Sequence, residues 1–316
     1  MGPKIRILKA QDKAARAIER RKMGRLGDLV VAPVTLNRYR TALGRFFLWV
    51  TAMMFTMPND GINLDFLLTE YIEYLWQEGD PVGWGNDLVS GFQHEIPHLK
   101  RQLVGAWRLL KAWTRLELPN RAAPLPPIGV LGFVGLSLLM GWQDLAVLIG
   151  LGFLGFLRTG ELFNLKKDDI TIKGSRILIT LAGTKTSVRK KANELSSVVS
   201  PWISRLLVKH LKNLEPGQRL LRRSPANARL LFKHIVEFFK LDQFNFQFYS
   251  LRRGGASWDF RLHGSMERTL LNGRWESVST ARVYVNDALA SSILVKMTGE
   301  SRLLLTQVAV LAKRTY

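Results

Sequence analysis

Cysteine is absent from the 316-residue sequence. This absence excludes disulfides, cysteine-ligated zinc and cysteine nucleophiles, and it is typical of an intracellular protein. Acidic residues are also scarce, because 25 Asp and Glu accompany 46 Lys and Arg and leave a formal net charge of +21. Such an excess of positive charge indicates a polyanionic partner, and nucleic acid is a better candidate than an anionic membrane surface.

Histidine is also rare, with 5 residues, so few side chains are available to ligate a metal ion. The segment His94-Glu95-Ile96-Pro97-His98 spells the H-E-x-x-H motif of zinc proteases, which needs one continuous helix to place both histidines on the same face. Pro97 removes a hydrogen bond inside that helical turn, so we do not expect a zinc site. P-loop, G-x-G-x-x-G and nucleophile-elbow motifs are missing as well, which leaves nucleotide binding and serine hydrolysis without support.

One long apolar run, residues 128–157, has the length needed to span a bilayer. Gln143 and Asp144 divide it into two pieces that are each too short to span as a helix. We therefore expect two buried helices that meet at a turn near residues 142–144, and no membrane partner. A membrane protein that uses residues 128–157 is the alternative.

Four prolines lie within residues 118–127. Proline at this density blocks both helix and sheet, so this stretch is the predicted linker between two domains. A basic arm is expected over residues 1–33 and a helical bundle over 34–117. The second domain is expected over 128–316, with a helical tail at its C-terminal end.

Hydrophobic periodicity predicts helices in the first domain at 64–77, at 97–116 and in a segment that Thr35 would cap and that runs through Val50. In the second domain a change of period predicts strands. The expected sheet has a hairpin over 169–181 and a strand pair over 181–199 with its turn at 184–191, and helices follow from residue 201. The predicted fold class is mainly α with a small antiparallel β-sheet.

Arg158 ends an apolar helix three residues before Glu161. A guanidinium so close to a buried region is either paired or functional, because its desolvation is expensive. Lys185 lies in a predicted strand turn, where a lysine is ordinarily a surface residue.

Arg252 and Arg253 enter a predicted helix just ahead of two glycines and an alanine, which permit close approach of a backbone or a phosphate. Arg274 and Trp275 follow a glycine, and Tyr284 lies nine residues beyond Trp275. Singly, an aromatic residue at either position is more often part of the core than of a catalytic site.

Together these motifs resemble the tyrosine recombinase (phage integrase) family. In chain order that family carries an arginine with a nearby acid, a hairpin lysine, His-x-x-Arg, then His or Trp, then a nucleophilic tyrosine. This sequence shows the same order: Arg158 and Glu161, Lys185, Tyr249-x-x-Arg252, Trp275 and Tyr284. The segments L-R-R-G-G-A-S and G-R-W are most similar to the recombinases of eukaryotic mobile elements. The resemblance is specific over 150–290 and weaker over 34–120, which looks like the family's core-binding domain.

The resemblance implies site-specific cutting and rejoining of DNA through a 3′-phosphotyrosyl intermediate on Tyr284, without metal, ATP or another cofactor. Arg158 and Arg252 would then bind the non-bridging phosphate oxygens, and Glu161 would orient Arg158. Lys185 would protonate the leaving 5′-oxygen, with Lys190 and Lys191 as alternatives. Trp275 would pack or hydrogen-bond at the phosphate, and Tyr249 would donate a hydrogen bond.

The partner implied by the resemblance is double-stranded DNA. Five arginines are candidate DNA contacts: Arg38, Arg40 and Arg45 in the first domain and Arg253 and Arg274 in the second. A homotetramer on paired DNA sites is expected if the C-terminal tail docks on a neighbouring protomer, and the alternative is a tail that packs on its own domain. In a eukaryotic cell the protein would be nuclear.

One position departs from the family pattern, because Tyr249 occupies the place of the histidine. Two alternatives stay open beside the recombinase, and only the first follows from this departure. The first is a catalytically weakened or inactive DNA-binding protein of the same fold. The second is a type IB topoisomerase, which shares the chemistry.

Overall fold

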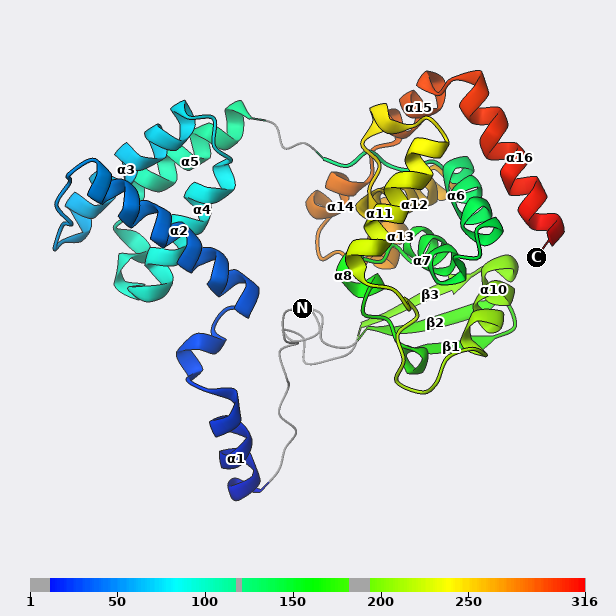
Figure 1. The fold of residues 1–316 in the computed structure, drawn as a ribbon, viewed down its shortest axis with the longest axis horizontal. Helices are drawn as coiled ribbons and strands as arrows, with labels where there is room; N and C mark the ends of the chain where they lie inside the picture. The colour runs from blue at the N-terminus through cyan, green and yellow to red at the C-terminus, as the bar shows by residue number, and fades with distance from the viewer. Residues whose placement is uncertain (1–11, 118–120, 182–193, 316) are drawn as a thin grey trace. The chain divides into compact units, whose positions relative to one another are not determined.

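The computed structural model describes residues 12–117, 121–181 and 194–315. The chain divides into two compact units, Met1–Asn120 and Arg121–Tyr316. In the described residues the first unit is helical, and the second combines helices with one small sheet (Figure 1). This confirms the predicted fold class. The division falls within the proline-rich stretch, and its residues 118–120 lie outside the described part of the chain.

The first unit contains the helices α1 (Lys13–Met23), α2 (Pro33–Ala52), α3 (Gly61–Gln77), α4 (Val82–Glu95) and α5 (Val104–Leu116), with short 3-10 turns at Leu26–Leu29 and Pro97–Arg101. Helix α2 begins at Pro33, where the missing N–H of proline costs nothing, so the prediction that Thr35 caps this helix is wrong. Helix α1 was not predicted. Asp12 caps it by accepting hydrogen bonds from the first backbone N–H groups.

Helix α4 was not predicted either, because its glycines lower helix propensity. Gly85 faces the Leu110 side chain of α5, and Gly91 faces Tyr39 of α2, so the missing side chains let α4 pack closely on both neighbours. Helix α4 ends at Glu95 and a 3-10 turn begins at Pro97, which confirms that the H-E-x-x-H spelling is not one helix. Among the residues that the structure describes, no cluster of three or more His, Asp or Glu could hold a metal ion.

The second unit contains the two predicted apolar helices, α6 (Pro127–Leu139) and α7 (Gln143–Leu154), which confirms the turn near residues 142–144. Both are largely buried in the core of this unit. Within the described ranges, no helix is long and apolar enough to cross a membrane.

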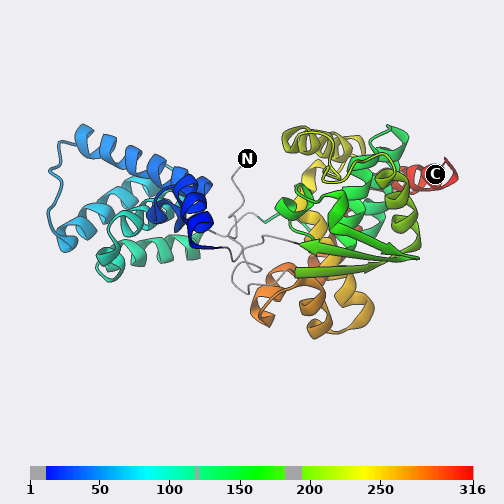
Figure 2. The same cartoon turned by 90° about the horizontal axis from the view of Figure 1, so that it is seen from below.

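A three-stranded antiparallel sheet follows, in the order β1 (Ile170–Lys173), β2 (Arg176–Leu181) and β3 (Glu194–Val199) (Figure 2). The β1–β2 turn contains Gly174 at a φ of +60°, a conformation that favours glycine. These strands confirm the hairpin over 169–181 and the pairing of 181 with the strand that ends at 199. The predicted turn at 184–191 lies outside the described residues.

The remaining helices are α8 (Thr159–Leu162), α10 (Pro201–Leu211), α11 (Pro225–Phe238), α12 (Phe248–His263), α13 (Met266–Gly273), α14 (Val278–Tyr284), α15 (Asp287–Lys296) and α16 (Gly299–Thr315). Helix α12 contacts α7, α13, α14 and α15, so it lies at the centre of the unit. Helix α16 packs along α6 through Leu305 and Val308 (Figure 1). The tail thus packs on its own unit in this structure.

Candidate active site

The turn after α7 carries the first predicted site residue. Arg158 is the N-cap of α8, and its backbone N–H donates to Oε2 of Glu161 at 2.8 Å. Its Nη1 donates to Oε1 of the same carboxylate at 2.6 Å. Although burial lowers the pKa of Arg158, the Glu161 charge and this hydrogen bond outweigh it, so the pKa is raised overall. The Arg158 side chain is 37% exposed, so it remains open to a ligand.

Glu161 also accepts a hydrogen bond from Nη2 of Arg274 at 2.7 Å. Arg274 follows α13 in the left-handed region, at a φ of +56°, and its side chain is 7% exposed. The Glu194 carboxylate lies 3.9 Å from Arg158 Nη1 and 3.8 Å from Arg274 Nε. Two arginines and two carboxylates therefore form one network, of which only Arg158 is appreciably exposed, and it joins α8, β3 and the residue after α13.

Arg252 is fully buried on the first turns of α12. Its Nη1 donates to the Phe156 carbonyl, and its Nη2 donates to the Gly273 carbonyl at 2.7 Å. Burial, followed by the charges of Arg158 and Arg274, lowers the pKa of Arg252 to about 10. No carboxylate among the described residues forms an ion pair with Arg252, so the site carries an uncompensated positive charge.

Two aromatic rings contact this guanidinium, and a third ring lies beside one of them. The Arg252 Cζ lies 4.7 Å from the centre of the Trp275 ring and 5.0 Å from that of Tyr284. The ring centres of Trp275 and Tyr284 are 4.7 Å apart, and those of Tyr249 and Tyr284 are 5.7 Å apart. Gly273 is required here, because a Cβ at that position would lie 1.9 Å from the Trp275 ring.

The Tyr249 ring lies beside the Tyr284 ring. Burial, followed by a side-chain hydrogen bond with Tyr284, raises the pKa of Tyr249 to about 12, although Arg252 and Arg253 act in the opposite direction. Tyr249 therefore stays protonated at neutral pH. It has a proton to donate at the position where the resembling family has histidine.

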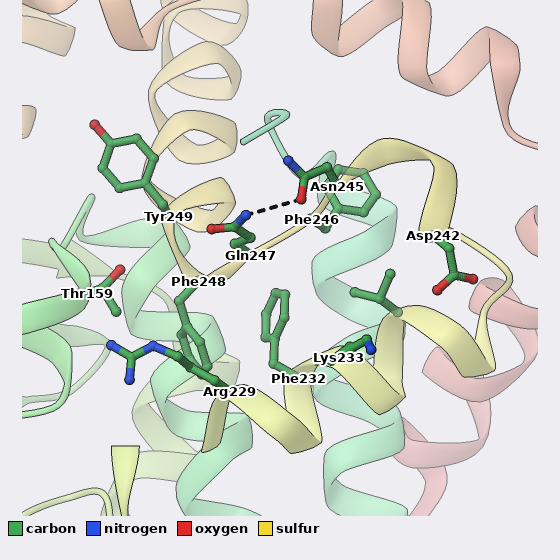
Figure 3. Close-up of a pocket in the computed structure, with 11 residues that line it drawn as sticks. Thr159, Arg229, Phe232, Lys233, Asp242, Asn245, Phe246, Gln247, Phe248 and Tyr249 are labelled. Carbon is green, nitrogen blue, oxygen red and sulfur yellow. Dashed lines mark hydrogen bonds between the residues drawn. The ribbon is translucent and has the colours of Figure 1, made fainter. Parts of the chain in front are cut away.

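A pocket of about 510 Å³ adjoins the site, and Thr159 and Tyr249 lie on its rim (Figure 3). Arg229 and Lys233 reach it from one face of α11, four residues apart. On the other side the Gln247 amide donates to Oδ1 of Asn245 at 3.1 Å. The pocket lining therefore combines two cationic side chains with the Asp242 carboxylate and adds amide groups that can hydrogen-bond a ligand.

The structure brings six of the predicted catalytic residues together: Arg158, Glu161, Tyr249, Arg252, Trp275 and Tyr284. Lys185 and its alternatives Lys190 and Lys191 lie outside the described residues. Sequence reasoning missed Glu194, for which the motif order gives no signal. It placed Arg274 among the DNA contacts, whereas the adjoining Trp275 could have indicated that Arg274 belongs to the site.

Arg253 is 4% exposed, and its Nη1 donates to the Ala122 carbonyl at 2.5 Å. Both Arg253 and Arg274 thus have partners inside the second unit, and their contact with DNA stays a prediction. The candidates in the first unit differ, because Arg38, Arg40 and Arg45 are all exposed on α2.

Two of those three arginines line a pocket of about 320 Å³ between α2 and α4. Arg38 forms a bidentate pair with Asp87, at 2.8 Å and 2.6 Å. The Arg45 Cζ lies 3.6 Å from the centre of the Trp84 ring. This face of the first unit therefore combines positive charge with an aromatic surface.

No family model matches the sequence, and no curated protein matches it. Similar solved structures do exist. The Tn1549 transposon integrase in complex with transposon right-end DNA is 12% identical, with a TM-score of 0.55, over 88% of this chain and 97% of that chain. A lambda integrase dimer bound to a COC′ core site is 14% identical, with a TM-score of 0.55, over 86% of this chain and 94% of that chain.

The XerH site-specific recombinase in a post-cleavage complex with palindromic difH substrate is 16% identical, with a TM-score of 0.51, over 78% of this chain and 75% of that chain. At these identities the similarity concerns the fold, and the likeness to recombinases of eukaryotic mobile elements stays a prediction. In both the arrangement of its helices and its small antiparallel sheet, the chain has the fold of the tyrosine recombinases.

Proposed function

We propose that this protein cuts and rejoins double-stranded DNA at specific sites through a 3′-phosphotyrosyl intermediate on Tyr284. The observation that carries the proposal is the contact of the buried Arg252 guanidinium with the Tyr284 ring, beside the Arg158–Glu161 pair. An arginine buried without a carboxylate partner is costly unless an anion binds beside it. A DNA phosphate supplies that anion.

Arg158 and Arg252 are the proposed phosphate ligands. Attack on a phosphodiester adds negative charge to the non-bridging oxygens, and guanidinium groups stabilise that charge through paired hydrogen bonds. Arg158 is held by Glu161 with part of its side chain exposed, so it can meet a phosphate without rearranging. A bound phosphate also opposes the repulsion from Arg158 and Arg274 that lowers the pKa of Arg252 after burial.

In the proposed reaction the Tyr284 hydroxyl gives its proton to solvent, and its oxygen bonds to phosphorus as the bond to the 5′-oxygen breaks. Lys185 is the proposed donor of the proton that the 5′-oxygen takes up, with Lys190 and Lys191 as alternatives. Tyr249, which keeps its own proton, is the proposed hydrogen-bond donor at the reacting phosphate or the Tyr284 oxygen. The phosphoester bond energy is kept in the intermediate, so rejoining uses neither ATP nor a metal.

The first unit is the proposed DNA-binding domain, and Arg38, Arg40 and Arg45 are its proposed contacts. Their exposure on one helix and the net charge of the chain support this assignment. A homotetramer on paired DNA sites remains part of the proposal, although α16 packs on its own unit here. In a eukaryotic cell the site of action is the nucleus.

A nicked suicide substrate tests the reaction. The nick makes the strand with the newly freed 5′-hydroxyl so short that it diffuses away, and the covalent protein–DNA adduct can then no longer rejoin. The wild-type protein is expected to form the adduct and Tyr284→Phe to lose it. Tyr74→Phe, which removes a hydroxyl from the first unit, serves as the matched control. An adduct that persists in Tyr284→Phe contradicts the assignment of the nucleophile.

Two further results separate the alternatives. DNA binding without any wild-type adduct identifies a DNA-binding protein that does not cut. Relaxation of supercoiled DNA without sequence preference identifies a topoisomerase.

A further inference from the structure

The residues that open the second unit lie against the helix that carries Arg252. The Leu125 backbone N–H donates to the Ser250 carbonyl at 3.1 Å, and Arg253 Nη1 donates to the Ala122 carbonyl at 2.5 Å. Ala122, Ala123 and Leu125 are all buried. The segment 122–125 is thus fixed on α12 at two points, and it lies within the stretch 118–127 that the sequence identifies as the linker.

This contact depends on glycine. A Cβ on Gly254 would lie 2.0 Å from the Leu125 carbonyl oxygen, and a Cβ on Gly255 would lie 2.0 Å from the Phe153 carbonyl oxygen. Both obstacles are backbone atoms, which cannot turn aside as a side chain can. The two glycines therefore let α12 fit between segment 122–125 and the end of α7.

Arg252 and Arg253 are consecutive residues with different tasks. Arg252 reaches Phe156 and Gly273 in the candidate active site, whereas Arg253 reaches segment 122–125. One helical turn thus fixes both the segment that leads to the first unit and the guanidinium beside Tyr284. Arg253 is buried without an ion-pair partner among the described residues, and an apolar side chain would avoid this desolvation cost.

We propose that Arg253 is a positioning residue, which anchors segment 122–125 on α12 and so couples DNA binding by the first unit to the placement of Arg252. The coupling rests on the proposed function, whereas the anchor does not. The anchor replaces the DNA contact that the sequence predicts for Arg253.

Limited digestion with trypsin tests the anchor without DNA. Trypsin cleaves after arginine, and the bond between Arg121 and Ala122 lies at the exposed edge of the fixed segment. Arg253→Gln is expected to release the segment and to raise the rate of this cut several-fold. Arg205→Gln, which removes a charge from an exposed position of α10, is expected to leave it unchanged.

Mass spectrometry locates the cuts, so global unfolding is recognised by equal acceleration at sites within α10. An Arg253→Gln protein that is cut after Arg121 at the wild-type rate overturns the anchor. A variant that is cut equally faster throughout the second unit also overturns it, because Arg253 then supports the whole fold.

Single-turnover cleavage of the nicked substrate tests the coupling. Arg253→Gln is expected to form the adduct about tenfold more slowly, the size of effect that follows loss of one charged hydrogen bond. Its DNA affinity is expected to keep the wild-type salt dependence, whereas loss of a phosphate contact would reduce the slope of log K against log salt by about 1. A reduced slope with unchanged cleavage overturns the proposal.

If the wild-type protein forms no adduct, the proposed function fails and the coupling with it, while the trypsin result still decides the anchor.

Discussion

The carboxylate of Glu161 accepts hydrogen bonds from the backbone N–H and Nη1 of Arg158 and from Nη2 of Arg274. Glutamine at this position keeps the shape of the side chain but removes the negative charge that orients the guanidinium groups of Arg158 and Arg274. We expect Glu161→Gln to slow adduct formation by about 100-fold, which is typical for loss of one aimed donor in a transition state. Single-turnover cleavage of the nicked substrate measures this rate.

Glu267→Gln is the matched control, because Glu267 is an exposed acid of α13. It is expected to cleave at the wild-type rate. A Glu161→Gln protein as fast as this control would show that Arg158 is aimed without the carboxylate.

The raised pKa of Tyr249 predicts a pH dependence of stability. In the unfolded chain tyrosine loses its proton near pH 10, whereas burial and the bond with Tyr284 raise the pKa of Tyr249 in the folded protein to about 12. The stabilising contribution is therefore complete below about pH 10 and is lost as the pH rises towards about 12. We expect the free energy of unfolding of the wild-type protein to fall relative to that of Tyr249→Phe across this window. Denaturant titrations at a series of pH values measure the difference, and parallel curves for the two proteins would contradict it.

The order of the motifs predicted the residues that meet in the site, but not which arginines would be buried. Arg158, Arg252, Trp275 and Tyr284 come together as expected. The fate of an arginine depends on partners far away in the chain, such as Ala122 for Arg253 at a separation of 131 residues. No local pattern reports such a partner, so an arginine with an internal role could not be distinguished from one that contacts DNA.

Among the helices, α6 and α16 pack closely along each other. A Cβ on Gly135 of α6 would lie 2.9 Å from the Val308 backbone oxygen of α16. Gly135→Ala must therefore push the two helices apart, and we expect it to lower the free energy of unfolding by about 1–3 kcal/mol, the usual cost of overpacking. Chemical denaturation followed by circular dichroism measures this change.

Gly44→Ala in α2 is a control of opposite sign. Nothing lies within 4 Å of the added Cβ, so the gain in helix propensity is expected to stabilise the protein by up to about 1 kcal/mol. If both substitutions changed the free energy of unfolding by the same amount, the packing of α16 on α6 would not depend on this close contact.

Helices with a clear apolar stripe, such as α2, and the β1–β2 hairpin could be predicted from periodicity alone. Helix α4 could not, because its glycines are selected by contacts with α2 and α5 rather than by local propensity. The expected helix over 97–116 is likewise divided, since a 3-10 turn ends at Arg101 and α5 starts at Val104. Tertiary packing decides these boundaries.

At the scale of the molecule, the net charge of +21 predicts DNA binding that weakens steeply with salt. Each neutralised phosphate releases counterions, so several contacts together should lower the affinity for duplex DNA by at least about 100-fold between 50 and 200 mM salt. Fluorescence anisotropy with a labelled duplex measures the slope, and Arg40→Gln is expected to reduce it by about 1. An affinity that does not change with salt would contradict a phosphate-dominated interface.

Segment 122–125 also determines where the chain can be divided for expression. A catalytic fragment that starts at residue 128, the boundary predicted from the sequence, would lack the Ala122 carbonyl that Arg253 binds and the Leu125 side chain that is buried in the core. Such a fragment would expose Gly254 and leave a buried guanidinium without its acceptor. A recombinant second unit therefore has to begin at Arg121 or earlier, so that the chain keeps the segment that packs on α12.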